Sequence, residues 1–145
     1  MISRRKGREF AMQLLYAMEV GQEAFGEALA GLSEDPAHGP EAKEYGEKLA
    51  RTVMDNQSEL DECIRVASNN WDMDRIAVID KIILRCAAAE LRYFGDVPAK
   101  VAINEALDIA KKFSTGDSGR FVNGVLDSIA KQFSNLNQRN SKDAQ

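Results

Sequence analysis

The sequence contains few of the residues on which catalysis and metal binding usually depend. Its 145 residues include one histidine, His38, and two cysteines, Cys63 and Cys86. A structural zinc site needs several such ligands at short spacing. No second histidine and no Cys-x-x-Cys pair is present, so the common zinc frameworks are excluded. Both cysteines lie in apolar helical patterns, which favours buried free thiols. We therefore expect no metal, no cofactor and no catalytic residue.

Long apolar runs are also missing. No run approaches the roughly 20 residues needed to span a bilayer. The N-terminal Met-Ile-Ser-Arg-Arg-Lys lacks the apolar core of a signal peptide. Hydrophobic residues make up 44% and charged residues 29% of the chain, as in an ordinary globular protein. The sequence thus predicts a cytoplasmic protein without a membrane segment.

Charge of each sign is confined to particular parts of the chain. The net charge is −4, but residues 21–72 hold 4 basic and 12 acidic side chains. Residues 1–20 hold four basic side chains against two acidic ones, and residues 73–145 hold 11 against 9. A protein with basic ends and an acidic middle can present a local basic surface to a polyanion and still remain soluble.

Apolar residues recur at three- and four-residue spacing through most of the chain, which predicts an all-α fold. The expected helices cover residues 9–20, 21–31, 41–54, 58–67, 72–94, 98–113 and 118–133. We expect one compact domain of about seven helices over residues 1–134, with a basic arm at 1–9. Residues 135–145 are polar and are predicted to be a disordered tail.

Residues 100–127 form the most informative stretch, two amphipathic helices joined by a polar elbow at 114–119. Within the second helix, Asn123-Gly124 is a dipeptide typical of a two-residue β-hairpin. The helical spacing continues on both sides of it, which favours helix. Because a glycine inside a helix costs about 1 kcal/mol relative to alanine, we expect another helix to approach closely at Gly124.

The basic arm holds four cations, Arg4, Arg5, Lys6 and Arg8. If the first helix extends back through Arg5, these charges lie at a helix N-terminus, where the macrodipole disfavours them. The arm is then either frayed when free or neutralised by an anion. A solubilising tail is the alternative interpretation.

Three blocks of the sequence resemble the NusB family of bacterial transcription antitermination factors. The first block is Arg5-x-x-Arg8-Glu9 followed by Ala11-x-Gln13-Leu14-Leu15-Tyr16-Ala17. The second is Trp71, Arg75-Ile76, Asp80-x-x-x-Leu84-Arg85 and Glu90-Leu91. The third comprises Pro98-x-Lys100-Val101-Ala102-Ile103-Asn104-Glu105-Ala106, Ala110-Lys111, Phe113 and Phe121-Val122-Asn123-Gly124-Val125-Leu126-Asp127. The blocks occur in the family's order and span about 120 residues.

The resemblance implies two packed helical subdomains and a function in transcription rather than catalysis. NusB-type proteins bind the boxA element of ribosomal RNA leader transcripts together with the ribosomal protein NusE. The pair joins RNA polymerase complexes with other Nus factors, which resist termination. Some family members are homodimers that cover their RNA-binding surface, and the sequence leaves open whether this chain is one.

The resemblance also implies site residues. The family's basic motif corresponds to Arg4, Arg5, Lys6 and Arg8, and its elbow to Asp117, Ser118, Arg120 and Phe121, all implied to contact RNA. Lys111 and Lys112 beside the elbow are further candidates for phosphate contacts, although alone they would form an ordinary solvated face. Phe121 either stacks on an RNA base or packs in the core. The NusE-facing surface corresponds to Asp80, with Arg75 and Arg85 beside it.

Two other functions compete with this one. A helical adaptor that binds only proteins requires the same fold but no RNA contact. An RNA-binding module of an rRNA methyltransferase would be followed by a catalytic domain, and we expect no such domain because the sequence contains no glycine-rich cofactor loop and no catalytic cysteine motif.

Overall fold

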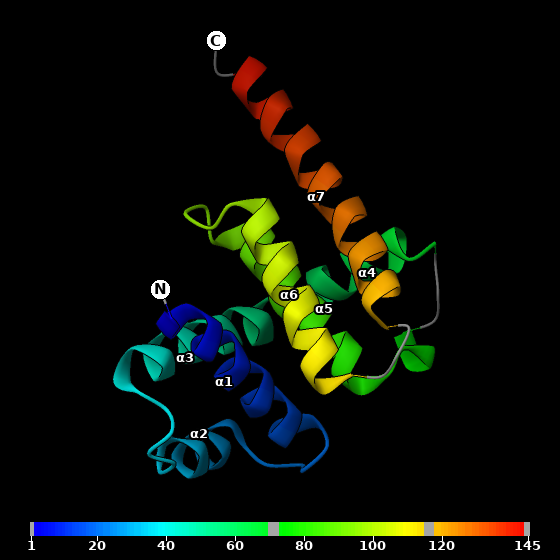
Figure 1. Cartoon of the computed structure of the whole chain (residues 1–145). Helices are drawn as coiled ribbons and strands as arrows, with labels where there is room; N and C mark the ends of the chain where they lie inside the picture. The colour runs from blue at the N-terminus through cyan, green and yellow to red at the C-terminus, as the bar shows by residue number, and fades with distance from the viewer. Residues whose placement is uncertain (1, 70–72, 115–117, 144–145) are drawn as a thin grey trace.

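The computed structural model describes residues 2–69, 73–114 and 118–143, and all of their regular structure is helical. The α-helices are α1 (Ile2–Glu19), α2 (Phe25–Ser33), α3 (Pro40–Asp55), α4 (Gln57–Ala67), α5 (Val78–Tyr93), α6 (Ala99–Phe113) and α7 (Ser118–Asp143), with a short 3-10 helix, η1, at Met73–Arg75 (Figure 1). The described chain therefore confirms the all-α prediction and the expected number of helices.

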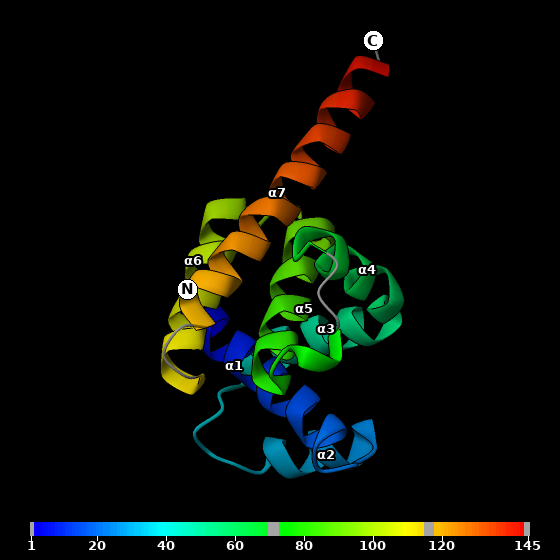
Figure 2. The same ribbon diagram turned by 90° about the vertical axis from the view of Figure 1, so that its right-hand side faces the viewer.

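The helices form two groups that meet at α5. Helices α1, α2 and α3 lie together on one side, and α4, α6 and α7 surround α5 on the other (Figures 1 and 2). Helix α5 packs against α1, α3, α4, α6 and α7. This central position follows from its sequence, because Ile82 to Glu90 are all buried and a helix that is apolar nearly all round must be enclosed.

Two glycines allow α1 and α3 to cross closely. A Cβ added at Gly46 would lie 2.7 Å from the carbonyl oxygen of Gly7 and 2.7 Å from Cδ1 of Phe10. A Cβ at Gly7 would lie 2.9 Å from the Tyr45 ring. The sequence predicted such a crossing at Gly124 instead. That prediction is wrong, because Gly124 is exposed within α7 and nothing lies within 4 Å of the position that a Cβ would take there.

Two boundaries differ from the sequence prediction. Helix α1 begins at Ile2, so the basic arm is its first turns. Helix α7 continues through residues 135–143, which were predicted to be disordered, and its end projects from the body of the protein (Figures 1 and 2). An existing helix extends without a new nucleation step, and no proline or glycine follows Gly124 to end it.

Within the described residues, no helix is long and apolar enough to cross a membrane. The same residues contain no group of three or more histidine, cysteine or acidic side chains arranged to hold a metal ion. Cys86 is buried and Cys63 half-buried, and both are free thiols. Burial raises the pKa of both thiols, which keeps them protonated and makes them poor nucleophiles.

Candidate nucleic-acid interface

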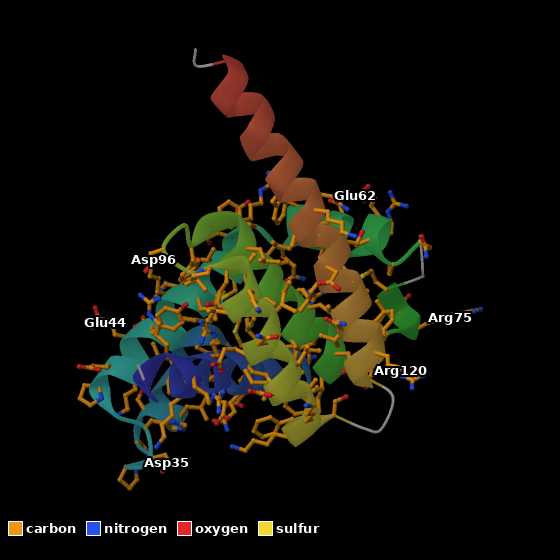
Figure 3. The ribbon with its side chains drawn as sticks, turned by 45° about the horizontal axis from the view of Figure 1, so that its top comes forward. Asp35, Glu44, Glu62, Arg75, Asp96 and Arg120 are labelled. Atoms are coloured by element: carbon orange, nitrogen blue, oxygen red, sulfur yellow. The ribbon has the colours of Figure 1, made fainter. Side chains whose placement is uncertain are left out.

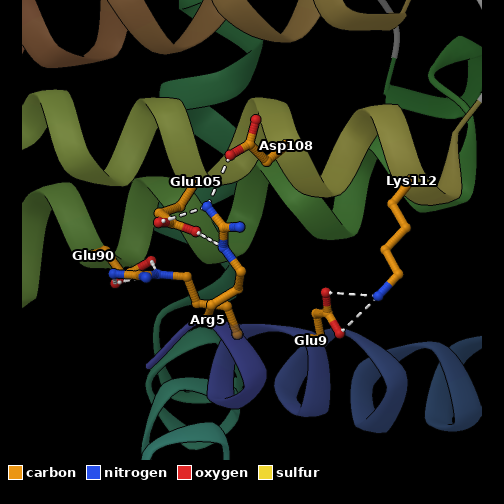
Figure 4. Close-up of polar contacts among 7 residues, drawn as sticks. Arg5, Glu9, Glu90, Glu105, Asp108 and Lys112 are labelled. Atoms are coloured by element: carbon orange, nitrogen blue, oxygen red, sulfur yellow. Dashed lines mark hydrogen bonds and ion pairs between the residues drawn. The ribbon is translucent and has the colours of Figure 1, made fainter. Parts of the chain in front are cut away.

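The first half of α1 lies beside α6, and ion pairs connect the two helices (Figure 4). Arg5 donates to Glu105 at 2.8 and 3.2 Å and to Asp108 at 2.9 Å. Further along both helices, Lys112 donates to Glu9 at 3.1 Å. Near the start of α1, Arg4 contacts Asp96, which precedes α6, at 2.7 Å. We call this line of paired charges the α1–α6 seam; it consists of Arg4, Arg5, Glu9, Asp96, Glu105, Asp108 and Lys112.

Two carboxylates of the seam, Asp96 and Glu105, remain ionised at neutral pH because their pKa values are lowered. The hydrogen bond from Arg4 lowers the pKa of Asp96, and the hydrogen bond from Arg5 lowers the pKa of Glu105. The arm is therefore helical because internal anions offset the unfavourable interaction of its cations with the helix dipole. This arrangement matches the expectation that an anion neutralises the arm, with the anion supplied by the protein itself.

Arg8, predicted to contact RNA, instead lies in the core. Its side chain is 6% exposed and donates to Glu90 from Nε at 2.8 and 3.0 Å and from a terminal nitrogen at 2.8 Å. Tyr45 donates its hydroxyl proton to the same carboxylate at 2.5 Å. Burial and this hydrogen bond raise the pKa of Tyr45, so the hydroxyl remains a donor. The guanidinium is thus enclosed and paired within the protein, and the predicted contact of Arg8 with RNA stays a prediction.

Three of the predicted RNA-binding cations are exposed and have no carboxylate partner among the described residues: Lys6, Lys111 and Arg120. Lys111 and Lys112 lie three and four residues after Asp108, so they continue the side of α6 that Asp108 occupies. Arg120 lies in the first turn of α7, across the elbow, and projects into solvent (Figure 3). Exposed cations thus extend from the start of α1 along α6 to the start of α7.

Asp80 holds the two sides of the elbow together. It receives hydrogen bonds from Ser114 at 2.7 Å and from Ser118 at 2.9 Å, and the two hydroxyls lie 2.8 Å apart. Asp80 is 6% exposed and lies under the elbow, and its predicted role at a partner-facing surface stays a prediction. Helical periodicity marks Asp80 as polar but does not reveal that the ends of α6 and α7 cover it. The Ser118 hydroxyl is directed at Asp80, and Asp117 lies outside the described residues.

Phe121 is partly buried and packs against the hydrophobic core. The interpretation of Phe121 as a core residue therefore holds only in part, because its side chain is not fully buried. Phe121 lies in α7, one residue after Arg120.

The two arginines predicted beside Asp80 lie in different environments. Arg85 is 7% exposed and donates to Asp61 at 2.7 and 3.0 Å and to Glu19 at 3.3 Å. Arg85 joins α1, α4 and α5, and its predicted role beside Asp80 at the NusE surface stays a prediction. Arg75 lies on η1 and points outward (Figure 3).

An apolar groove of about 220 Å³ lies where α1, α5 and α6 meet. Its lining residues are Met12, Gln13, Tyr16, Ala17, Ile79 and Phe113. Tyr16 is 40% exposed although it lies within a largely buried helix. The sequence did not predict this groove. Residues of three helices line it, and the apolar periodicity of α1 does not indicate where α5 and α6 lie. Ile79 places the groove next to Asp80 and the elbow.

The sequence matches the NusB family over residues 5–131. The chain belongs to this family.

Named relatives and solved structures agree with this assignment. Transcription antitermination protein NusB of Chloroherpeton thalassium is 46% identical over 127 residues, which are 87% of this chain and 60% of that protein. The NusB protein of Trichlorobacter lovleyi is 40% identical over 87% of this chain and 89% of its own length. A crystal structure of antitermination factors NusB and NusE in complex with double-stranded RNA contains a chain that is 28% identical, with a TM-score of 0.82 and coverage of 91% and 98%. The NusB family is not a family of enzymes, in agreement with the predicted absence of catalysis.

Proposed function

We propose that this chain is a transcription antitermination factor that binds the boxA element of ribosomal RNA leader transcripts together with the ribosomal protein NusE. The observation that carries the proposal is that three cations from different helices, Lys6 of α1, Lys111 of α6 and Arg120 of α7, are exposed and have no carboxylate partner among the described residues. The relatives named as antitermination proteins, and the solved complex of NusB and NusE with RNA, support it. The protein acts in the cytoplasm, where transcription takes place, within RNA polymerase complexes that contain other Nus factors.

The RNA contacts divide into two kinds. Lys6, Lys111 and Arg120 contact phosphates, and such contacts weaken with salt whatever the RNA sequence. Near the elbow, the exposed part of Phe121 stacks on an unpaired base, the usual way in which proteins read single-stranded RNA. Asp80 acts indirectly, because its bonds to Ser114 and Ser118 fix the elbow on which Arg120 and Phe121 are carried.

NusE docks on the apolar groove beside the elbow. The groove has mainly apolar lining residues and a half-exposed tyrosine, Tyr16. Tyrosine is enriched among the residues that dominate binding energy at protein interfaces. This position differs from the predicted one, which relied on Asp80 and Arg85 being at the surface. Arg75 is exposed on η1 and remains a candidate contact for NusE.

RNA binding is tested by fluorescence anisotropy with a single-stranded boxA RNA, a scrambled single strand and a duplex. We expect the boxA strand to bind tightest. In the Lys6→Ala/Lys111→Ala/Arg120→Ala variant, the slope of log K against log salt should fall by about 0.7 for each phosphate contact that the substitutions remove. Lys131→Ala, an exposed lysine later in α7, is the control and should leave the slope unchanged. An unchanged slope in the triple variant refutes this surface.

NusE binding is tested with Tyr16→Ala against Tyr93→Ala, because the two tyrosines are 40% and 39% exposed. Only Tyr16→Ala should weaken NusE binding, by at least about tenfold if Tyr16 is a central contact. Equal effects of the two variants refute the groove as the docking site. Binding of NusE without any RNA binding would instead favour the protein-only adaptor. Light scattering of the free protein shows whether it is a homodimer.

A further inference from the structure

Two arginines that the resemblance implies to contact RNA are ion-paired with carboxylates of the protein itself. Arg4 pairs with Asp96, and Arg5 pairs with Glu105 and Asp108. The Arg5–Glu105 contact uses both Nε and a terminal nitrogen, the fork geometry with which arginine also binds a phosphate. A carboxylate and a phosphodiester oxygen therefore compete for the same donors.

We propose that Asp96, Glu105 and Asp108 form a carboxylate mask that RNA must displace to reach Arg4 and Arg5. This inference rests on the proposed function and concerns how the same surface is regulated. The mask offsets the three exposed cations of the arm, Arg4, Arg5 and Lys6, with three anions. Its effect is to reduce the attraction of the arm for polyanions in general.

The exposure of the pairs allows displacement. The side chains of Arg4 and Asp96 are 44% and 65% exposed, those of Arg5 and Asp108 are 54% and 49% exposed, and that of Glu105 is 20% exposed. Ion pairs in such positions are weak, because water and salt screen them. The neighbouring Arg8–Glu90 pair has exposures of 6% and 2%, so the same exchange is not open to it. RNA can therefore displace the carboxylates of the mask from Arg4 and Arg5, whereas it cannot displace Glu90 from Arg8.

Displacement leaves the helix packing unchanged. Helix α1 packs closely on α2, α3 and α5, whereas the seam is bridged by long side chains. Rotation of the Arg4 and Arg5 side chains toward solvent is therefore enough to change partners. An RNA strand that is also bound by Lys6, Lys111 and Arg120 keeps its phosphates near the arm while they replace the carboxylates at Arg4 and Arg5.

The test replaces two carboxylates of the mask by uncharged amides of the same shape, Glu105→Gln/Asp108→Asn. Its matched control is Glu23→Gln/Asp55→Asn, which makes the same change in net charge at exposed carboxylates without ion-pair partners among the described residues. Two charges removed at roughly 7 Å from a phosphate should tighten RNA binding by about threefold to tenfold at about 0.1 M salt or below. Because phosphate contacts carry no sequence information, boxA and scrambled RNA should both gain.

Elution from a heparin column provides a second readout that does not depend on RNA recognition. The mask variant should elute at higher salt than the control. If the wild-type protein binds boxA RNA but the mask variant gains nothing over the control, the mask is refuted and the proposed function stands. If the mask variant binds RNA more weakly, the carboxylates orient Arg5 for RNA, and the mask is likewise refuted. A heparin shift without RNA binding by any variant refutes the proposed function, and it shows that the carboxylates reduce the attraction of the arm for polyanions in general but do not regulate RNA binding.

Discussion

Replacement of Arg8 by methionine tests whether this residue acts in the core, through its buried pair with Glu90, or as the predicted RNA contact. The change leaves the Glu90 carboxylate, 2% exposed, with the Tyr45 hydroxyl as its remaining partner among those described. Removing one member of a buried ion pair typically costs about 3–5 kcal/mol, because the other charge stays buried and unpaired. A domain of this size loses roughly 2–4 °C of Tm per kcal/mol. We therefore expect Arg8→Met to lower the Tm by roughly 6–20 °C.

Thermal denaturation followed by circular dichroism measures this fall in Tm, and urea denaturation followed in the same way measures the free energy of unfolding. Lys6→Met is the control, since it removes an exposed cation of the same arm and should change stability by no more than about 0.5 kcal/mol. Arg8→Met/Tyr45→Phe/Glu90→Leu removes the charges and the hydroxyl together and should recover most of the lost stability, because an apolar cluster of similar volume often equals a buried pair. A stable Arg8→Met protein that binds RNA more weakly than Lys6→Met would show the opposite, namely that Arg8 contacts RNA.

Two further predictions concern packing and pH. Gly46→Ala should destabilise the protein by about 1–3 kcal/mol, because the new methyl group meets the Gly7 carbonyl and Phe10. Gly124→Ala should stabilise the protein by about 1 kcal/mol in the same urea assay, because nothing lies near the new methyl group. Equal effects of the two substitutions would disprove the close crossing of α1 and α3. The lowered pKa values of Asp96 and Glu105 mean that their ion pairs stabilise the fold above the unfolded-state pKa of about 4 and stop doing so as pH falls through the lower folded-state values. Between about pH 6 and pH 3, Asp96→Asn/Glu105→Gln should therefore lose less stability than the wild-type protein, and parallel pH profiles would show that these pairs contribute nothing.

The all-α fold was predictable because each helix has an apolar stripe that its own sequence reports. Contacts between helices were less predictable. Periodicity in α1 separates Phe10 and Leu14 from the basic arm, but it does not distinguish Arg8, which is buried, from Arg5, which is exposed. That difference depends on Glu90, a residue 82 positions away in α5. The same limit explains the misplaced glycine crossing, since Gly46 and Gly124 look alike in sequence and only one faces another helix.

Three predicted site residues that the structure buries share a feature that also bears on how the exposed cations are positioned. Arg8, Asp80 and Arg85 are charged residues within the motifs that resemble the family, and each is buried with a partner from another helix. Their strong sequence signal therefore reflects the cost of leaving a buried charge unpaired. Each of the first two supports an exposed neighbour: Arg8 fixes the turn of α1 that carries Arg4 and Arg5, and Asp80 fixes the elbow beside Arg120. Placement of the exposed cations thus depends on the buried charges beneath them, so a variant such as Asp80→Ala is expected to weaken RNA binding without removing any RNA contact.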